Sequence, residues 1–238
     1  MAPQPAIVAR GLHVVRGGKA LLRGIDIEVR RGEVVGVLGP SGAGKSTLFR
    51  ALVGESLPDR GAVVLEGVDV TRDPLWRRAR IGIGYVPQGP SVLWELTVAE
   101  NLATFRHVAR LPPEPPRFMA ARVGLGELLG IRAGALSGGE RRRLELARAI
   151  TRSPRVLVCD EPFAGVDPAG AERLGLLLGD LARDGTAVLL ADHHVAEALR
   201  ICSRAVLLLD GTVAASAPAG AFAEHPLVRG RYLGTFGI

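Results

Sequence analysis

The sequence predicts an α/β fold with three parts: an N-terminal antiparallel β-subdomain, a central, mostly parallel sheet flanked by helices, and an inserted α-helical subdomain. Alternating apolar and polar residues within 7–29 are typical of half-buried antiparallel strands. From residue 156 onward, short apolar stretches alternate with helical patterns, which indicates parallel strands buried on both faces. Residues 89–150, between these two parts, have a mostly helical pattern.

Turn signals divide the N-terminal part into strands. Gly17-Gly18 separates two of the alternating stretches, and a short apolar strand over 33–38 runs into a glycine-rich turn. A helix is expected to begin near Lys45. Two further strands are predicted over 62–66 and 81–86.

The helical part begins after Gln88. Thr97 and Glu100 have the spacing of a capping box at a helix start, and a proline-rich segment over 111–116 interrupts the helical pattern. We therefore expect a single domain over 1–238, which divides into a core with the β-subdomain (1–88 and 151–215), a helical subdomain (89–150) and a C-terminal tail (216–238) that is helical from Gly220.

The composition is that of a folded chain. It has 238 residues, 47% of them hydrophobic, which is enough for one sizeable core. No apolar stretch has the length of a membrane-spanning helix, and the N-terminus lacks the pattern of a secretory signal. We expect a cytoplasmic protein that associates with the inner membrane only peripherally. Cys159 and Cys202 lie in or beside apolar stretches and are expected to be reduced, buried thiols.

The net charge of +6 and the pI of about 10.3 come almost entirely from arginines. These are spread along the chain, and the densest runs, over 76–80 and 141–143, are short. The chain has no basic stripe with interleaved aromatic residues of the kind that single-strand nucleic-acid binders use. We interpret the runs as solvated helix faces and expect no nucleic-acid partner.

A phosphate-binding loop follows the apolar strand at 33–38. It has the spacing GxxxxGK[ST] and comprises Gly39, Pro40, Ser41, Gly42, Ala43, Gly44, Lys45 and Ser46, with Thr47 next in the helix. Its backbone N–H groups and the helix N-terminus hold anionic phosphates. Lys45 is expected to reach the outer phosphates, and the Ser46 hydroxyl to coordinate Mg²⁺. ATP and Mg²⁺ are therefore the expected cofactors.

A pair of acids ends the apolar strand that begins at residue 156. Asp160 is placed to hold Mg²⁺, directly or through water, opposite Ser46. Glu161 is the best candidate to orient and polarise the attacking water. The Asp-Glu pair is a weak signal alone and a strong one downstream of a phosphate-binding loop.

A second phosphate cradle is predicted from Leu136, Ser137, Gly138, Gly139 and Glu140. Ser137 and Glu140 also have the spacing of a capping box, and this structural interpretation is compatible with the functional one. A hydroxyl and two glycine amides at a helix N-terminus can hold phosphate. Because one ATP does not need two cradles from one chain, a second copy can supply the other.

These motifs together resemble those of ATP-binding subunits of ABC transporters. They occur in the family's order, cover essentially the whole chain and are Gly39–Ser46, Gln88, Leu136–Glu140, Cys159-Asp160-Glu161-Pro162 and His193. The resemblance implies an ABC ATPase with the P-loop NTPase fold, which acts as a head-to-tail dimer and places two ATPs between one chain's loop and the other chain's Ser137-Gly138-Gly139. It further implies that Gln88 senses Mg²⁺ and the water and reports to the membrane subunits, and that Asp167 lies across the dimer interface.

The resemblance also bears on positions 193 and 16. The resemblance places the family's switch histidine, which contacts the γ-phosphate, at His193, whereas His194 is expected to begin the next helix. Family members usually have an aromatic residue near position 16 that stacks on adenine, but this chain has Arg16. A guanidinium can also stack on a π-face, so Arg16 remains an ATP-binding candidate.

A narrower resemblance concerns the transported substance. The stretches 80–88, 137–143, 160–168, 192–195 and 232–234 resemble the ATPase subunit of the lipopolysaccharide export system, which drives lipopolysaccharide extraction from the inner membrane. ATPases of branched-chain amino-acid uptake systems are the alternative, because they share the tail pattern. The segment after 111 looks shortened relative to the export family.

Val92, Leu93 and Trp94 follow Gln88, and we expect them to line a groove that receives a coupling helix of an integral membrane subunit. Ordinary subdomain core is the alternative for these three residues.

Two other function classes are less favoured. A soluble ABC-type ATPase acting on DNA or the ribosome would carry a coiled-coil insertion or two cassettes, and this chain has neither. A regulator that binds ATP without hydrolysing it would lack one of Lys45, Glu161 or His193, and all three are present.

Overall fold

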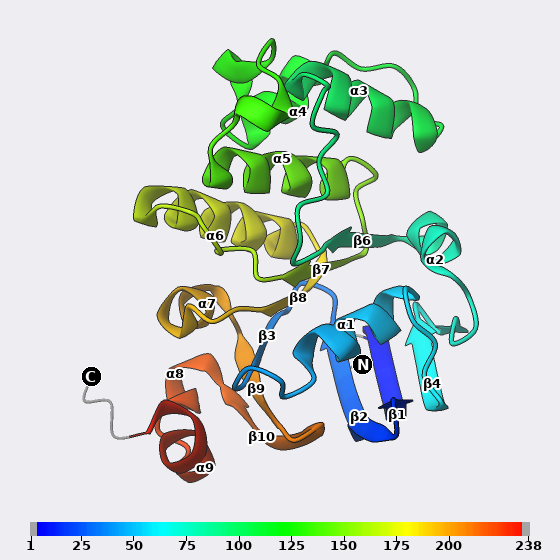
Figure 1. The fold of residues 1–238 in the computed structure, drawn as a ribbon, viewed down its shortest axis with the longest axis vertical. Helices are drawn as coiled ribbons and strands as arrows, with labels where there is room; N and C mark the ends of the chain where they lie inside the picture. The colour runs from blue at the N-terminus through cyan, green and yellow to red at the C-terminus, as the bar shows by residue number, and fades with distance from the viewer. Residues whose placement is uncertain (1–3, 235–238) are drawn as a thin grey trace.

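A computed structural model describes residues 4–234, which contain two β-sheets (Figure 1). The N-terminal sheet is antiparallel, with the strand order β2-β1-β4-β5. Its strands are β1 (Pro5–Arg16), β2 (Lys19–Arg30), β4 (Arg60–Leu65) and β5 (Val68–Asp69). Their alternating burial corresponds to the alternating sequence pattern.

The central sheet has the strand order β10-β9-β3-β8-β7-β6. All its strands are parallel except β10, which is antiparallel to β9. The strands are β3 (Val34–Leu38), β6 (Ile83–Val86), β7 (Val156–Asp160), β8 (Ala187–Ala191), β9 (Arg204–Leu209) and β10 (Thr212–Pro218).

Helices surround the central sheet and form one end of the molecule (Figure 1). The helices that follow strands of the core are α1 (Lys45–Val53), α2 (Leu75–Ile81), α6 (Pro168–Arg183) and α7 (Val195–Ile201). The inserted part holds α3 (Val98–Val108), α4 (Pro116–Arg122), η1 (Gly126–Leu128), η2 (Ala133–Ala135) and α5 (Gly138–Ile150). The last elements are α8 (Ala219–Phe222), α9 (Pro226–Val228) and η3 (Arg229–Leu233).

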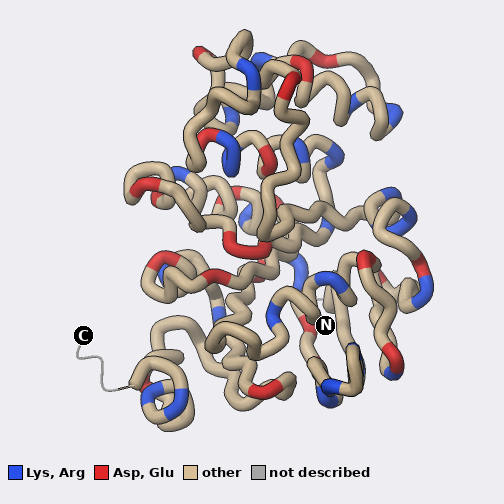
Figure 2. Tube along the Cα trace, viewed as in Figure 1, with Lys and Arg blue, Asp and Glu red and all other residues tan. Residues whose placement is uncertain are grey.

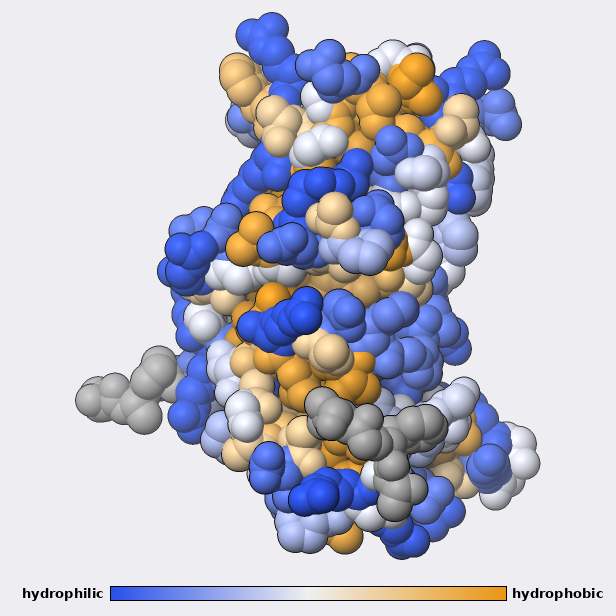
Figure 3. Space-filling view, turned by 90° about the vertical axis from the view of Figure 1, so that its left-hand side faces the viewer, coloured by the Kyte–Doolittle hydropathy of each residue, from blue (hydrophilic) through white to orange (hydrophobic). Residues whose placement is uncertain are grey.

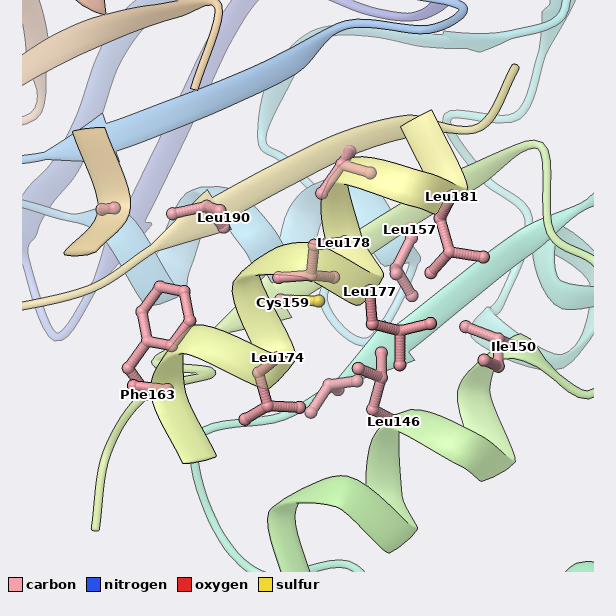
Figure 4. Close-up of a cluster of buried hydrophobic side chains, with 14 of the residues drawn as sticks. Leu146, Ile150, Leu157, Cys159, Phe163, Leu174, Leu177, Leu178, Leu181 and Leu190 are labelled. Atoms are coloured by element: carbon pink, nitrogen blue, oxygen red, sulfur yellow. The ribbon is translucent and has the colours of Figure 1, made fainter. Parts of the chain in front are cut away.

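Strand β7 illustrates why the core strands are apolar throughout. Every residue of β7 is buried, and successive side chains point to opposite faces of the sheet. Leu157 and Cys159 join the cluster with α5 and α6, whereas Val156 and Val158 join the cluster with α1 and the antiparallel sheet. Figure 4 shows the first cluster, with leucines of α6 packed between β7 and α5. Burial on both faces therefore requires an unbroken apolar stretch.

The predicted fold class is confirmed, but strand β10 was not expected from the sequence. Helix α2 lies at 75–81, where the arginine run was interpreted as a helix face, and strand β6 begins at Ile83 rather than at residue 81. Strand β10 runs through Pro218, and helix α8 begins at Ala219, next to the expected start of the helical tail. The boundaries of the subdomains remain a prediction.

Charged and apolar side chains are interspersed on the surface that Figures 2 and 3 show. None of the helices in residues 4–234 is long and apolar enough to cross a membrane. Lysine and arginine residues occur in all parts of the trace rather than along one stripe (Figure 2). On the face with α6 and α7, apolar areas are interspersed with hydrophilic ones (Figure 3).

Candidate nucleotide site

The carboxyl ends of four neighbouring strands bring together most of the predicted site. In the order β3-β8-β7-β6, the phosphate-binding loop follows β3, Asp192 and His193 follow β8, and Gln88 follows β6. Asp160 ends β7 and is paired with Ala191 of β8. Parallel strands present their carboxyl ends at the same edge of a sheet, which is where α/β proteins bind ligands.

The loop between β3 and α1 has a backbone that only glycine fits at its first position. Gly39 has a φ of 154°, and a Cβ atom there would lie 2.2 Å from the carbonyl oxygen of Leu208. Any side chain would therefore displace the loop from β9. Lys45 is 7% exposed, and its Nζ atom donates to the carbonyl oxygens of Gly39 (2.6 Å) and Pro40 (3.0 Å). The ammonium thus lies within the loop, at the place where phosphate oxygens would compete for it.

Burial and neighbouring groups act together on the charges of this site. Burial lowers the pKa of the Lys45 ammonium, while Glu161, Asp160 and Asp192 act to raise it. Burial raises the pKa of the Asp160 carboxyl, the Ser46 hydroxyl opposes that shift, and the Glu161 carboxylate adds to it. The Ser46 hydroxyl is therefore near enough to the Asp160 carboxyl to act on its pKa.

Two side-chain nitrogens approach one oxygen of the Glu161 carboxylate, and the one from Gln88 donates a hydrogen bond to it. Its Oε1 atom lies 2.9 Å from Nε2 of Gln88 and 2.9 Å from Nε2 of His193. Glu161 itself has a φ of 55°, in the left-handed region, and its N–H donates to the carbonyl of Ala191 (2.7 Å). Gln88, Glu161 and His193, which follow β6, β7 and β8, therefore meet at one carboxylate oxygen.

Asp192 is 1% exposed and fixes the loops around this point. Its Oδ2 atom accepts from the N–H of Phe163 (2.9 Å), and Oδ1 accepts from the N–H of His194 (2.9 Å). The Nδ1 atom of His194 lies 2.8 Å from the same Oδ1. His194 is the residue before α7, and the side chain of His193 is left half exposed to the site.

The second predicted cradle lies at the start of α5. Ser137 and Glu140 form a reciprocal capping box, in which each side chain bonds the other residue's backbone. A Cβ atom on Gly138 would lie 2.9 Å from the carbonyl oxygen of Gly165, so this segment packs against the loop before α6. Asp167 caps α6 by accepting from the N–H of Gly170 (2.9 Å). Within residues 4–234, no hydrogen bond joins 136–140 to the phosphate-binding loop.

Arg16 is held at the end of β1 by acceptors. Its guanidinium donates to the carboxylate of Asp59 (3.2 Å) and to the carbonyl of Leu57 (2.9 Å). Asp59 also accepts from the N–H of Val15 (2.7 Å). The Arg16 side chain is 48% exposed, so the guanidinium is fixed while part of its surface stays open.

The three residues expected in a partner groove have different environments. Leu93 and Trp94 are 37% and 45% exposed, and the guanidinium of Arg141 lies 5.4 Å from the centre of the Trp94 ring. Val92, in contrast, is 4% exposed and belongs to the main core cluster. The expectation for Val92 is therefore corrected to the core alternative.

The sequence interpretation of the arginine run at 141–143 was wrong for two of its members. Arg142 and Arg143 are 6% and 8% exposed, so they are buried rather than on a solvated helix face. Arg142 contacts the backbone of Asp160 and Glu161, and Glu145 accepts from the N–H of Ser91 (2.6 Å). The apolar residues that follow these positions in α5, at Leu144, Leu146, Ala147 and Ile150, were the available signal, because they indicate a helix with a broad buried face.

Comparison with known proteins agrees with the fold described above. The family model described as "ABC transporter" matches residues 22–164. The "lipopolysaccharide export system ATP-binding protein LptB" of Acidithiobacillus ferridurans is 42% identical over 220 residues, which is 91% of each chain. The protein of the same name in Escherichia coli K12 is 34% identical and covers 96% of this chain and 97% of its own. A "probable ABC transporter ATP-binding protein" of Azorhizobium caulinodans is 40% identical, covering 96% and 83%.

Solved structures agree with this result. The ADP conformation of MJ1267, an ATP-binding cassette of an ABC transporter, superposes with a TM-score of 0.87 at 26% identity, covering 97% of this chain and 99% of that one. A dimeric, post-hydrolysis cassette of MJ0796 bound to ADP and Pi superposes with a TM-score of 0.81 at 25% identity, covering 90% and 98%.

Proposed function

Because this chain belongs to the ABC transporter family of ATP-binding proteins, where it is an ATP-hydrolysing subunit, we propose that it powers the export of lipopolysaccharide from the inner membrane. The observation that carries the proposal is the identity of 34–42%, over more than nine-tenths of the chain, to relatives that bear this function in their names. The stretch 160–168 and the pair His193-His194 are the sequence features that we assign to the same group.

For the chemical step, we assign Glu161 as the group that polarises the attacking water. Its carboxylate is held by Gln88 and His193, so it is oriented before substrate arrives. Lys45 would exchange its loop carbonyls for the outer phosphates, and His193 would contact the γ-phosphate. The backbone of Gly39–Ser46 and Thr47 would hold the remaining phosphate oxygens.

We propose that Mg²⁺ is held by Ser46, Asp160 and Gln88 together with the nucleotide. Among residues 4–234, no group of three or more His, Cys, Asp and Glu side chains could hold a metal by itself. The Ser46 hydroxyl nevertheless lies near enough to the Asp160 carboxyl to oppose the effect of burial on its pKa. This set fits Mg²⁺, which proteins usually bind through one or two oxygen ligands plus phosphates and water. The ion would neutralise charge that develops on the phosphates.

We further propose a head-to-tail dimer with the Ser137-Gly138-Gly139 segment of each copy closing over the other copy's ATP. The segment is exposed at its serine and makes no hydrogen bond to the loop of its own chain among the described residues. Its contact with the loop at 165–167 would place Asp167 at the same interface. The related MJ0796 cassette, whose structure is described as dimeric, supports this arrangement.

The test of the catalytic assignment is Glu161→Gln. The amide keeps the shape of the side chain but cannot polarise water, so turnover should fall by ~10²–10⁴-fold while ATP binding is kept. An ATP-bound dimer should then accumulate on a sizing column. Glu172→Gln, which changes an exposed glutamate of α6, is the matched control and should leave turnover unchanged. Normal turnover in Glu161→Gln would remove Glu161 from this role.

Leu93 and Trp94 are proposed as the contact with a coupling helix of the integral membrane subunits. Their exposed apolar side chains lie close to the start of α5, since Arg141 stacks on Trp94. A contact with Leu93 or Trp94 would therefore act on the start of α5, where the second phosphate cradle lies. Trp94→Ala should weaken co-purification with the membrane subunits, whereas Leu176→Ala, which removes an exposed leucine of α6, should not.

The substrate assignment is tested by purifying the full chain with its membrane subunits from native membranes. We expect integral subunits that carry bound lipopolysaccharide, and ATP hydrolysis that depends on them. Co-purification with amino-acid permease subunits would instead support the uptake alternative, and recovery with nucleic acid or ribosomes would contradict both.

A further inference from the structure

One face of helix α5 carries three charged residues that are withdrawn from solvent. Arg142, Glu145 and Arg148 follow one another at a spacing of three residues, so they lie along the same side of the helix. They are 6%, 4% and 8% exposed. Buried charges are retained in proteins when hydrogen bonds satisfy them, so the partners of these three side chains are informative.

Arg142 connects the backbone next to Gln88 with the backbone at Glu161. Its Nη1 atom donates to the carbonyl of Pro87 (2.6 Å), directly before Gln88, and its Nη2 atom donates to the carbonyl of Glu161 (2.8 Å). Nη2 also donates to the carbonyl of Asp160. A single planar guanidinium therefore fixes the backbone on both sides of the hydrogen bond between Gln88 and Glu161.

The backbone at Glu161 is one that needs such support. With a φ of 55°, Glu161 adopts a left-handed conformation that residues other than glycine rarely have. The direction of its side chain follows from the orientation of the peptide units on either side. Because Arg142 holds the carbonyls of residues 160 and 161, it sets where the Glu161 carboxylate points.

The other two charged residues hold the far end of the loop that carries Gln88. Oε1 of Glu145 accepts from the N–H of Ser91 (2.6 Å), and Nη1 of Arg148 donates to the carbonyl of Ser91 (2.7 Å). Oε2 of Glu145 also accepts from Nη1 of Arg142 (2.7 Å). The segment 87–91 is thus tied to α5 at both ends, and Glu145 orients Arg142.

We propose that Arg142 is a positioning residue for Glu161 and Gln88, and that it couples the start of α5 to the chain's own catalytic base. This inference rests on the proposed function, in which Ser137-Gly138-Gly139 contacts the ATP of the partner copy. A shift of α5 when that ATP is seated is transmitted through Arg142 to the carbonyls of residues 160 and 161. Each copy's base is then aligned in response to the nucleotide on the other copy's loop.

The test is Arg142→Lys in the full-length chain, measured as steady-state ATP hydrolysis and as binding of a fluorescent ATP analogue. One ammonium cannot reproduce the bonds that two guanidinium nitrogens make in a fixed plane. We expect kcat to fall by ~10–100-fold, with KM and the dissociation constant of the analogue changed by less than ~3-fold. Cooperativity between the two ATPs should also fall. Turnover within ~2-fold of the unchanged chain would overturn the proposal.

Arg143→Lys is the matched control, because Arg143 is the adjacent residue and equally buried. Among the described residues it donates no hydrogen bond to Asp160 or Glu161. It should leave kcat within ~2-fold of the unchanged chain. Glu145→Gln is a second variant that keeps the shape but removes the charge that orients Arg142, and a smaller loss of kcat is expected. If neither Arg142→Lys nor Glu145→Gln lowers kcat in folded protein, the inference is overturned.

A double mutant separates positioning from a general structural effect. If Arg142 acts through Glu161, Arg142→Lys should not lower the residual hydrolysis of Glu161→Gln, measured over hours with radiolabelled ATP. A further loss equal to that in the unchanged chain would show an effect independent of Glu161 and would contradict the proposal. Unimpaired turnover in Glu161→Gln alone would instead contradict the proposed function, so the two failures are distinguishable.

Discussion

The carboxyl group of Asp160, which we propose as a ligand of Mg²⁺, would have to be ionised to bind the metal, in a place that disfavours its charge. It is 2% exposed, and burial raises its pKa above the usual 3.8. Nearby Glu161 acts in the same direction, and the Ser46 hydroxyl only partly opposes it. A raised pKa means that the folded chain binds this proton more tightly than the unfolded chain, so folding stability falls as pH rises through the folded-state pKa.

Replacing Asp160 with Asn should therefore make the nucleotide-free chain more stable at neutral pH and catalytically inactive. Each ~1 kcal/mol regained should raise Tm by ~2–4 °C in a chain of this size. The gain in Tm should be larger at about pH 7.5 than at about pH 3, because below its ordinary pKa Asp160 stays protonated and its burial then carries no cost of ionisation. Differential scanning calorimetry at both pH values measures this. Asp180→Asn, at a half-exposed position, should change Tm little at either pH, and a lower Tm for Asp160→Asn at pH 7.5 would contradict the argument.

At the scale of elements, the sequence predicted strands better than it predicted how helices are buried. The unbroken apolar pattern of β7 and β8 requires burial on both faces, so these strands were found. Strand β10 was missed although Asp210-Gly211 is a hairpin signal, and both residues have a positive φ. Arg142 of α5 was assigned to solvent because arginine is usually exposed, whereas here backbone carbonyls accept hydrogen bonds from its guanidinium. The partners come from distant segments, which no local pattern contains.

Helix α2 contains the run at 76–80, and its interpretation as a solvated helix face was wrong for Arg78. Its Arg78 is completely buried, and burial lowers the pKa of its guanidinium to about 10. The side chain donates to the carbonyls of Ala51 (2.8 Å) and Leu52 (2.7 Å) at the end of α1, and to those of Thr71 (2.9 Å) and Asp73 (2.8 Å). Arg78 thus satisfies the last carbonyls of the helix that carries the phosphate-binding loop.

Arg78→Met should lower the free energy of unfolding by ~3–5 kcal/mol, because the aliphatic part is kept while several buried carbonyls lose their donor. Urea denaturation followed by circular dichroism measures the change. Arg77→Met, which affects an exposed side chain paired with Asp73, should cost no more than ~1 kcal/mol. Equal losses in the two variants would mean that burial of the Arg78 guanidinium does not stabilise α1.

At the scale of the whole molecule, the two predicted phosphate cradles of one chain lie on different elements. Lys45, Asp160, Glu161 and His193 lie together at the carboxyl edge of the central sheet. Ser137-Gly138-Gly139 lies at the start of α5, against the loop before α6. The sequence could predict both phosphate cradles from their residue types, but only the fold shows that no hydrogen bond joins them among residues 4–234. In the dimer that we propose, hydrolysis requires a second copy.

Ser137→Arg should separate binding from hydrolysis on that basis. The chain keeps its phosphate-binding loop, so it should bind ATP as a monomer, but the bulky cation would prevent closure over the partner's nucleotide. In the unchanged chain, hydrolysis per chain should rise with chain concentration as dimers form, and this rise should be absent in the variant. The matched control is Thr97→Arg, because Thr97 and Glu100 form the equivalent capping box on α3 and its loss costs a similar ~1 kcal/mol. Concentration-dependent hydrolysis that survives in Ser137→Arg, or is lost equally in Thr97→Arg, would mean that the start of α5 is not part of the composite site.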